Sequence, residues 1–230
     1  TPVTNTDGTI TSSVSANTDA GFSIVSWTQG SGVQTIGHGL QTKPALIIAR
    51  SRSLANNWYV YDEINGATKY LLLNGTAASA SSSNTWNNTE PTDSVFTANE
   101  LAFGTGNQVA YCFHSVEGFS KIGSYVGNGS GTDGPFVYTG FRPALVIGKR
   151  SNSTGNWWMI DNKRDPENAD PHNFLYSNLN IAEASSSTAD YDFLSNGFKI
   201  MNTTTDMNAS GGTYIFIAFS ENPFKYSTAR

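Results

Sequence analysis

The segment Lys43-Pro-Ala-Leu-Ile-Ile-Ala-Arg50 returns later in the chain as Arg142-Pro-Ala-Leu-Val-Ile-Gly-Lys149. Each copy begins with a basic residue and proline, continues with a short apolar run and ends on a basic residue. A short apolar run rich in β-branched residues is typical of a buried strand, and proline is tolerated at the first position of a strand. The pair therefore predicts two equivalent strands in a duplicated chain.

The repeat extends outward from this segment in both directions. Asn57-Trp-Tyr-Val-Tyr-Asp62 matches Asn156-Trp-Trp-Met-Ile-Asp161, and Ile24-Val-Ser-Trp27 matches Ile122-Gly-Ser-Tyr125. Short aromatic and β-branched runs alternate with Gly-, Asn- and Ser-rich turns, and no segment has a convincing helical period. We therefore expect an all-β protein of two homologous β-sandwich halves, jelly-roll or lectin-like, with one large sandwich as the alternative.

The repeat also sets the expected domain boundaries. Residues 21–120 form the first predicted sandwich repeat, and residues 121–230 form the second. Residues 1–20 are almost entirely Thr, Ser, Asn, Asp, Gly and Ala without periodicity. This composition predicts an extended N-terminal leader or linker.

Composition excludes several classes of function. Only 13% of the 230 residues are charged, the net charge is −5 and the pI is about 5.1. Nucleic-acid binding needs a basic stripe, which is absent, so no nucleic-acid partner is expected. No apolar run approaches the roughly 18 residues of a membrane span, so no membrane insertion is expected. The single cysteine, Cys112, lies in an apolar strand and is predicted to be a buried thiol.

Two Ser-rich loops resemble sugar-binding loops in their residue types. Each ends in Asn-Trp and then Asp, at residues 51–62 and 151–161. An exposed ring can cover the apolar face of a sugar while an amide or carboxylate binds its hydroxyls. The candidate glycan- or partner-contact residues are Tyr59, Asp62, Trp158 and Asp161. The alternative interpretation is a core Trp at the start of a strand, with Asp ending that strand in a turn.

Trp86 is a further contact candidate, because it lies in the polar segment 84–89. Loop residues are usually exposed, so this ring could contact a glycan or a partner subunit. The alternative is a ring that folds back and covers the edge of the sandwich.

The sequence gives no catalytic, metal or cofactor site. The clustered carboxylates are Asp62 and Glu63, Asp161, Asp165 and Glu167, and Asp190 and Asp192. They lie mostly in turns, without the apolar surroundings that would raise a pKa for acid catalysis. His38, His114 and His172 have no metal-ligand spacing. The stretch 161–165 lacks the Gly and terminal Glu of a calcium loop.

Several longer motifs resemble a known domain. They include Gly21-Phe-Ser-Ile-Val-Ser-Trp27 and Asp133-Gly-Pro-Phe-Val-Tyr-Thr-Gly-Phe-Arg-Pro143. Together with similar strings they cover about residues 21–230. The chain resembles a duplicated β-domain of unassigned activity found in virion and tail-fibre-like structural proteins of tailed phages, many of them marine or cyanobacterial. The resemblance implies no catalytic residue.

The resemblance implies a virion structural component, assembled in the bacterial host cytoplasm. The expected role is a tail or fibre module with adhesion to a host-surface glycan. Its expected partners are other virion proteins and further copies of the chain, as a trimer. One alternative is a capsid-decorating or cement protein, with residues 1–20 as an arm on a neighbouring subunit. The other is a carbohydrate-active enzyme, which would need two carboxyl groups facing each other in a cleft.

Overall fold

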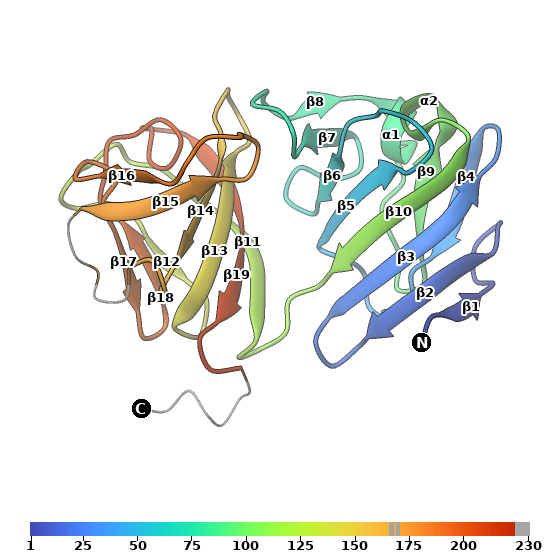
Figure 1. The fold of residues 1–230 in the computed structure, drawn as a ribbon, viewed down its shortest axis with the longest axis horizontal. Coiled ribbons are helices and arrows are strands. Elements are labelled where there is room, and N and C mark those ends of the chain that lie inside the picture. Colours follow the sequence, from blue (N-terminus) through green and yellow to red (C-terminus); the bar gives the residue numbers. More distant parts are fainter. Residues whose placement is uncertain (166–167, 169–170, 224–230) are drawn as a thin grey trace. The chain divides into compact units, whose positions relative to one another are not determined.

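Strands dominate the chain in the computed structural model, and the predicted all-β fold is confirmed (Figure 1). The structure describes residues 1–165, 168 and 171–223. It divides into two units. Residues 1–73 and 79–114 form the first, and residues 74–78 together with the chain from Ser115 onward form the second.

The first unit is built on an antiparallel eight-stranded sheet. Its strands, in spatial order, are β1 (Val3–Asn5), β2 (Ser12–Asn17), β3 (Phe22–Gln29), β10 (Gly106–Phe113), β5 (Leu46–Ser51), β6 (Tyr59–Asp62), β7 (Lys69–Leu72) and β8 (Ala80–Ser81).

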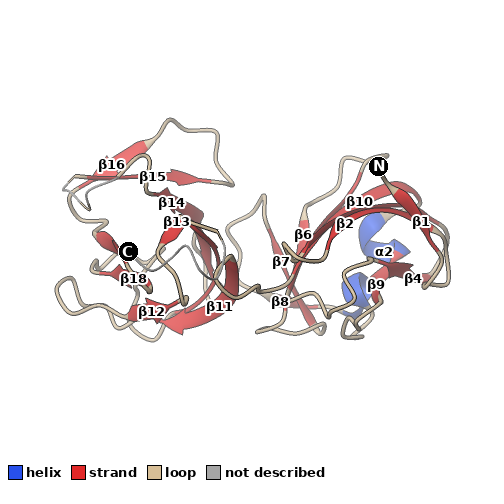
Figure 2. Ribbon diagram, turned by 90° about the horizontal axis from the view of Figure 1, so that it is seen from below, coloured by secondary structure: helices blue, strands red, loops and turns tan. Residues whose placement is uncertain are grey.

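A second layer covers one face of this sheet. It consists of the pair β4 (Val33–Gly37) and β9 (Val95–Asn99) and two short helices, α1 (Ser83–Trp86) and α2 (Glu100–Phe103). Figure 2 shows these elements together on one side of β2 and β10. None of the helices in the described part of the chain is long and apolar enough to cross a membrane.

The core of the first unit lies between these two layers, on what we call the inner face of the large sheet. Alternation along β3 shows how the sequence produces it: Val25 and Trp27 are buried in the core, whereas Ile24 between them is exposed. Side chains of a strand point alternately to the two faces, so the intervening residues form the opposite, outer face.

The expected leader is wrong for much of residues 1–20, because this polar segment contains β1 and β2. β2 pairs with β3 along its whole length, which places Val14 in the core. The Ser12 hydroxyl donates to the carbonyl oxygen of Gly37 at 2.7 Å. A Cβ at Gly37 would lie 1.6 Å from Oδ1 of Asn5, so any larger residue there would force the Asn5 side chain to move. The segment pairs within its own sheet, contrary to the arm expected of a cement protein.

The second unit contains a six-stranded sheet and a three-stranded sheet around a second core. The larger sheet runs in the order β11 (Ser120–Val126), β19 (Thr213–Ser220), β13 (Pro143–Arg150), β14 (Trp157–Asp161), β15 (His172–Tyr176) and β16 (Ala184–Ser186). The smaller sheet runs in the order β12 (Phe136–Tyr138), β18 (Gly197–Ile200) and β17 (Tyr191–Leu194).

The strand order of the second unit, β11-β19-β13-β14-β15-β16, matches the order β3-β10-β5-β6-β7-β8 of the first. Strands at the same position in the two orders are those that the sequence repeat aligned, for example β5 and β13. Common origin of the halves by duplication stays a prediction. The first unit ends at His114, short of the predicted boundary at residue 120.

Candidate functional site

A row of side chains crosses the outer face of the large sheet in the first unit. Strand register places Thr4 opposite Ser13, Ser13 opposite Ser26, Ser26 opposite Val109, and Val109 opposite Arg50. Directly opposed residues on one face lie close enough for their side chains to interact. The row therefore joins hydroxyl groups on one side of the sheet to a guanidinium group on the other.

An open hollow of about 380 Å³ lies over the hydroxyl end of this row. It is lined by Thr4, Thr11, Ser12, Ser13, Ser26, Trp27, Thr28, Arg52, Asn107 and Gln108. Hydroxyls and amides both donate and accept hydrogen bonds, so this lining is complementary to a polyhydroxylated ligand.

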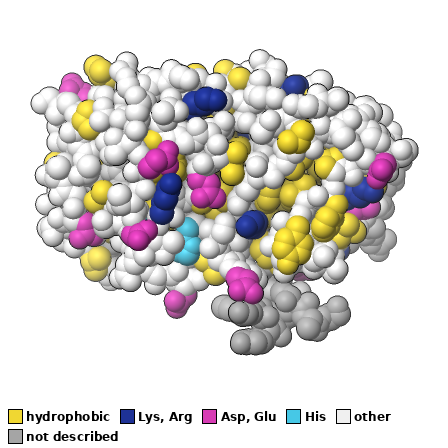
Figure 3. All heavy atoms as spheres, turned by 180° about the vertical axis from the view of Figure 1, so that it is seen from behind, with side chains coloured by type: hydrophobic (Ala, Val, Ile, Leu, Met, Phe, Trp, Pro, Cys, Tyr) yellow, Lys and Arg dark blue, Asp and Glu magenta, His cyan; other side chains and the backbone are white. Residues whose placement is uncertain are grey.

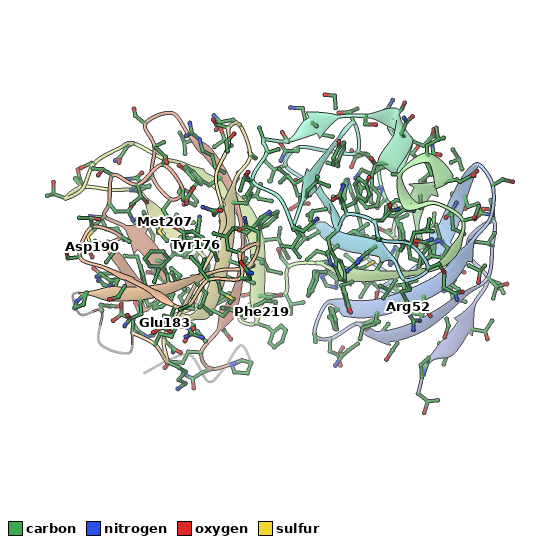
Figure 4. All side chains as sticks on the ribbon, turned by 45° about the horizontal axis from the view of Figure 1, so that its top comes forward. Arg52, Tyr176, Glu183, Asp190, Met207 and Phe219 are labelled. Carbon is green, nitrogen blue, oxygen red and sulfur yellow. The ribbon has the colours of Figure 1, made fainter. Side chains whose placement is uncertain are left out.

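A second hollow, of about 340 Å³, adjoins the first because Arg52 lines both. Its other lining residues are Arg50, Ser51, Leu54, Trp58 and Val109. Figure 4 labels Arg52 beside the strands of the large sheet. We call the two hollows together the outer-face site. It combines a polar floor, an apolar wall and two arginines, and none of the described residues that line it is acidic.

The Trp58 ring lines the second hollow, and a row of aromatic rings continues from it along the sheet. The rings of Trp58 and Tyr111 are stacked with centroids 6.2 Å apart, and those of Tyr111 and Phe22 with centroids 6.4 Å apart. The Arg50 guanidinium carbon lies 5.3 Å from the centre of the Trp58 ring, within cation–π range. Trp58 therefore helps to hold Arg50 at the hollow.

The loop between β5 and β6 is fixed by hydrogen bonds. Ser51 Oγ accepts from the backbone N–H groups of Ser53 and Leu54, at 3.3 and 3.2 Å. Asn56 donates from Nδ2 to the carbonyl oxygens of Ala102 and Phe103, both at 2.9 Å. These bonds hold the loop against α2 and fix the position of the wall of the hollow.

Both tryptophans among the predicted contact residues are buried, and their expected exposure is wrong. Trp86 is 2% exposed and Trp158 is 0% exposed. The polar segment around Trp86 forms α1, which directs the ring toward Tyr61 and Phe103 in the core. Trp158 points inward because strand alternation runs opposite to the expected phase, and its ring lies over Gly148.

The side chains of Tyr59 and Asp62 also make contacts within the first unit instead of facing the outer-face site. The Tyr59 ring contacts Tyr70 and Phe103 on the inner face, with ring centroids 5.4 and 5.2 Å away. Asp62 is buried, and burial raises its pKa although Asn65 donates to its carboxylate from both the backbone and the side chain. Asp62 thus ends its strand in a turn, as the alternative interpretation held.

Asp161 has the same turn role in the second unit. Its carboxylate accepts from the backbone N–H groups of Lys163 and Arg164, both at 3.0 Å, and pairs with the Arg164 side chain at 2.8 Å. The structure thus places none of the five predicted contact residues in the outer-face site.

The carboxylates considered for catalysis are used in a different way. Asp165 contacts Nδ1 of buried His172, and Asp190 lies 2.7 Å from its Nε2. The imidazole thus fills the space between the two carboxylates, where a glycosidase would admit substrate or water. Glu167 lies outside the described residues. Among the described residues, no group of three or more His, Cys, Asp or Glu side chains is arranged to hold a metal ion.

The predicted contact loop, residues 51–62, supplies part of the lining of the outer-face site, but Arg50, Arg52 and Trp58 were not among the predicted contact residues. The detectable signal was the i, i+2 spacing of Arg50 and Arg52 around the end of a strand. The contribution of β1, β2, β3 and β10 to the same site could not be read locally, since it depends on strand pairing.

The family model described as Domain of unknown function (DUF7483) matches residues 1–223. No curated protein and no solved structure matches the chain.

Proposed function

We propose that this chain, which belongs to the DUF7483 family of domains of unknown function, is a non-enzymatic saccharide-binding module of a virion structural protein. In this proposal the outer-face site binds a glycan on the host surface. The module would form part of a tail or fibre, together with other virion proteins and further copies of itself. The observation that carries the proposal is the pair of adjoining hollows with a hydroxyl-lined floor and an aromatic wall.

The chemistry of the lining supports a sugar as ligand. Ser13, Ser26, Thr28 and Asn107 present neutral hydrogen-bonding groups, which exchange readily with the hydroxyls of a sugar. Trp58, Leu54 and Val109 present apolar surface for its C–H face. The hydrogen bonds that fix the loop reduce the entropy lost on binding.

The surface supports an adhesive role over an enzymatic one. On the face drawn in Figure 3, charged side chains are scattered among wide uncharged areas. The Asp165 and Asp190 carboxylates both contact His172, and no carboxylate of the described part of the chain lines the outer-face site. General acid catalysis of glycoside cleavage needs such a carboxyl group beside the bound sugar.

The test is binding of the purified chain to an array of bacterial surface saccharides. We expect the wild type to bind at least one saccharide, and Trp58→Ala to weaken this binding at least tenfold because it removes the apolar wall. Asn107→Ala should weaken it about fivefold, the effect of one lost hydrogen bond of roughly 1 kcal/mol. Affinities would be measured by isothermal titration calorimetry.

Tyr138→Ala is the matched control, because it removes a ring that is 64% exposed on β12 in the second unit. Its affinity should equal that of the wild type. Failure of the wild type to bind any saccharide, or equal binding by Trp58→Ala, would contradict the proposal. A place in the virion is tested separately, by locating the chain in an electron-microscopy map of the particle.

A further inference from the structure

The arginines of the outer-face site indicate which class of saccharide it takes. We infer that the ligand is an acidic saccharide, whose anionic group is held between Arg50 and Arg52. This inference rests on the proposed function of the same site and adds the charge of the ligand to it.

The guanidinium groups of Arg50 and Arg52 belong to the same hollow. Arg50 occupies the outer face of β5, and Arg52 follows two residues later, directly after the end of that strand. Both line the same hollow of about 340 Å³. A guanidinium presents a planar fork of donors that matches a carboxylate or a phosphate, and two forks on one hollow create a site for one anion.

None of the described residues supplies an anion to these two arginines. Within the described part of the chain, neither Arg50 nor Arg52 takes part in an ion pair. Nε of Arg50 is buried and has no hydrogen-bond acceptor. Because neither arginine pairs with a carboxylate of the described residues, both positive charges remain to be neutralised by a ligand in the hollow.

Neighbouring groups hold the two arginines in position. The Trp58 ring lies under the Arg50 guanidinium at 5.3 Å, and the backbone N–H of Arg52 donates to the carbonyl oxygen of Asn107 at 2.7 Å. Arg52 therefore stands at the junction of the apolar hollow and the hydroxyl-lined hollow. A saccharide spanning both would place an anionic substituent at this junction and its hydroxyls over Ser26 and Thr28.

The anion could be a uronic-acid carboxylate or a phosphate ester, because both fit an arginine fork. Two pairs of probes distinguish these sources. The first pair is an oligogalacturonate and its carboxyl-reduced form. The second pair is a glycosylated poly(glycerol phosphate) and the neutral saccharide left after its phosphates are removed.

We expect the wild-type chain to bind one acidic probe, and its affinity to fall at least tenfold when the anionic group is removed. Arg50→Gln and Arg52→Gln should each cause a similar loss for the acidic probe. Arg50→Lys should retain part of the affinity, because it keeps the charge and loses the fork. Affinity should also fall as sodium chloride is raised, since salt screens exposed charges.

Lys121→Gln is the charge-matched control, because it removes one exposed positive charge on β11, outside the site. It should leave affinity unchanged, and near-ultraviolet circular dichroism would verify the fold of every variant. If the wild type bound acidic and neutral probes equally and Trp58→Ala lost this binding, the acidic preference would be overturned. The saccharide site itself would still be supported. Absence of binding to every saccharide would overturn both.

Discussion

Gly148 on β13 lies directly beneath the Trp158 indole, and it shows how one residue decides the packing of the second core. A Cβ at this position would lie 2.0 Å from Cζ2 of Trp158, far inside van der Waals contact. The ring is 0% exposed, so it has no free space into which it could move. Overpacking of this kind costs about 1–3 kcal/mol.

We therefore expect Gly148→Ala to lower the free energy of unfolding by about 1–3 kcal/mol. Urea denaturation followed by tryptophan fluorescence would measure the change. Gly131→Ala is the control, because its Cβ would meet only the Thr203 methyl group at an ordinary 3.6 Å. Equal stability of the Gly148→Ala variant and the wild type would contradict this account of the packing.

At the scale of elements, one carboxylate joins three segments of the first unit. Glu90 accepts hydrogen bonds from the Tyr61 hydroxyl at 2.6 Å, the Ala67 backbone at 2.7 Å and the Lys43 ammonium at 3.0 Å. Burial by itself raises the pKa of Glu90, but these three donors outweigh it and hold the pKa below its usual value of 4.5.

A carboxyl group with a lowered pKa in the folded state stabilises the fold above its unfolded pKa, and this contribution is lost as the pH falls. We expect Glu90→Gln to reduce the free energy of unfolding at pH 7 by about 1 kcal/mol, a value discounted because the side chain is half exposed. The difference from the wild type should shrink as the pH falls below 4.5. Urea titrations between pH 3 and pH 7 measure it, and a difference independent of pH would refute the assignment.

At the scale of the whole molecule, the role in a fibre that the resemblance implies predicts an assembly of identical chains. A trimer of the 24.7 kDa chain is expected from its resemblance to fibre-like virion proteins. Multivalent display raises the apparent affinity for a repeating surface polysaccharide without any new contact. Sedimentation equilibrium should give three times the chain mass, and a single-chain mass at all concentrations would contradict the trimer.

The sequence by itself determined the all-β class and the repeated strands, because alternation and short apolar runs can be read from neighbouring residues without knowing which strands pair. It located the loop of residues 51–62, because Ser, Asn and Trp cluster there. It assigned Trp86 and Trp158 to the surface, whereas the phase of a strand and the turn of α1 direct both rings inward. Only the partner layer sets that phase.

The tertiary structure alone decided the composition of the candidate site. Ser26 and Arg50 belong to one row across the sheet, because β10 pairs with both β3 and β5 and places Val109 between them. It also decided that residues 1–20 complete a sheet, since their polar side chains carry no apolar pattern and their pairing relies on backbone hydrogen bonds to β3. Backbone hydrogen bonding depends little on side-chain identity, so long-range strand pairing of this kind leaves only a weak trace in the sequence.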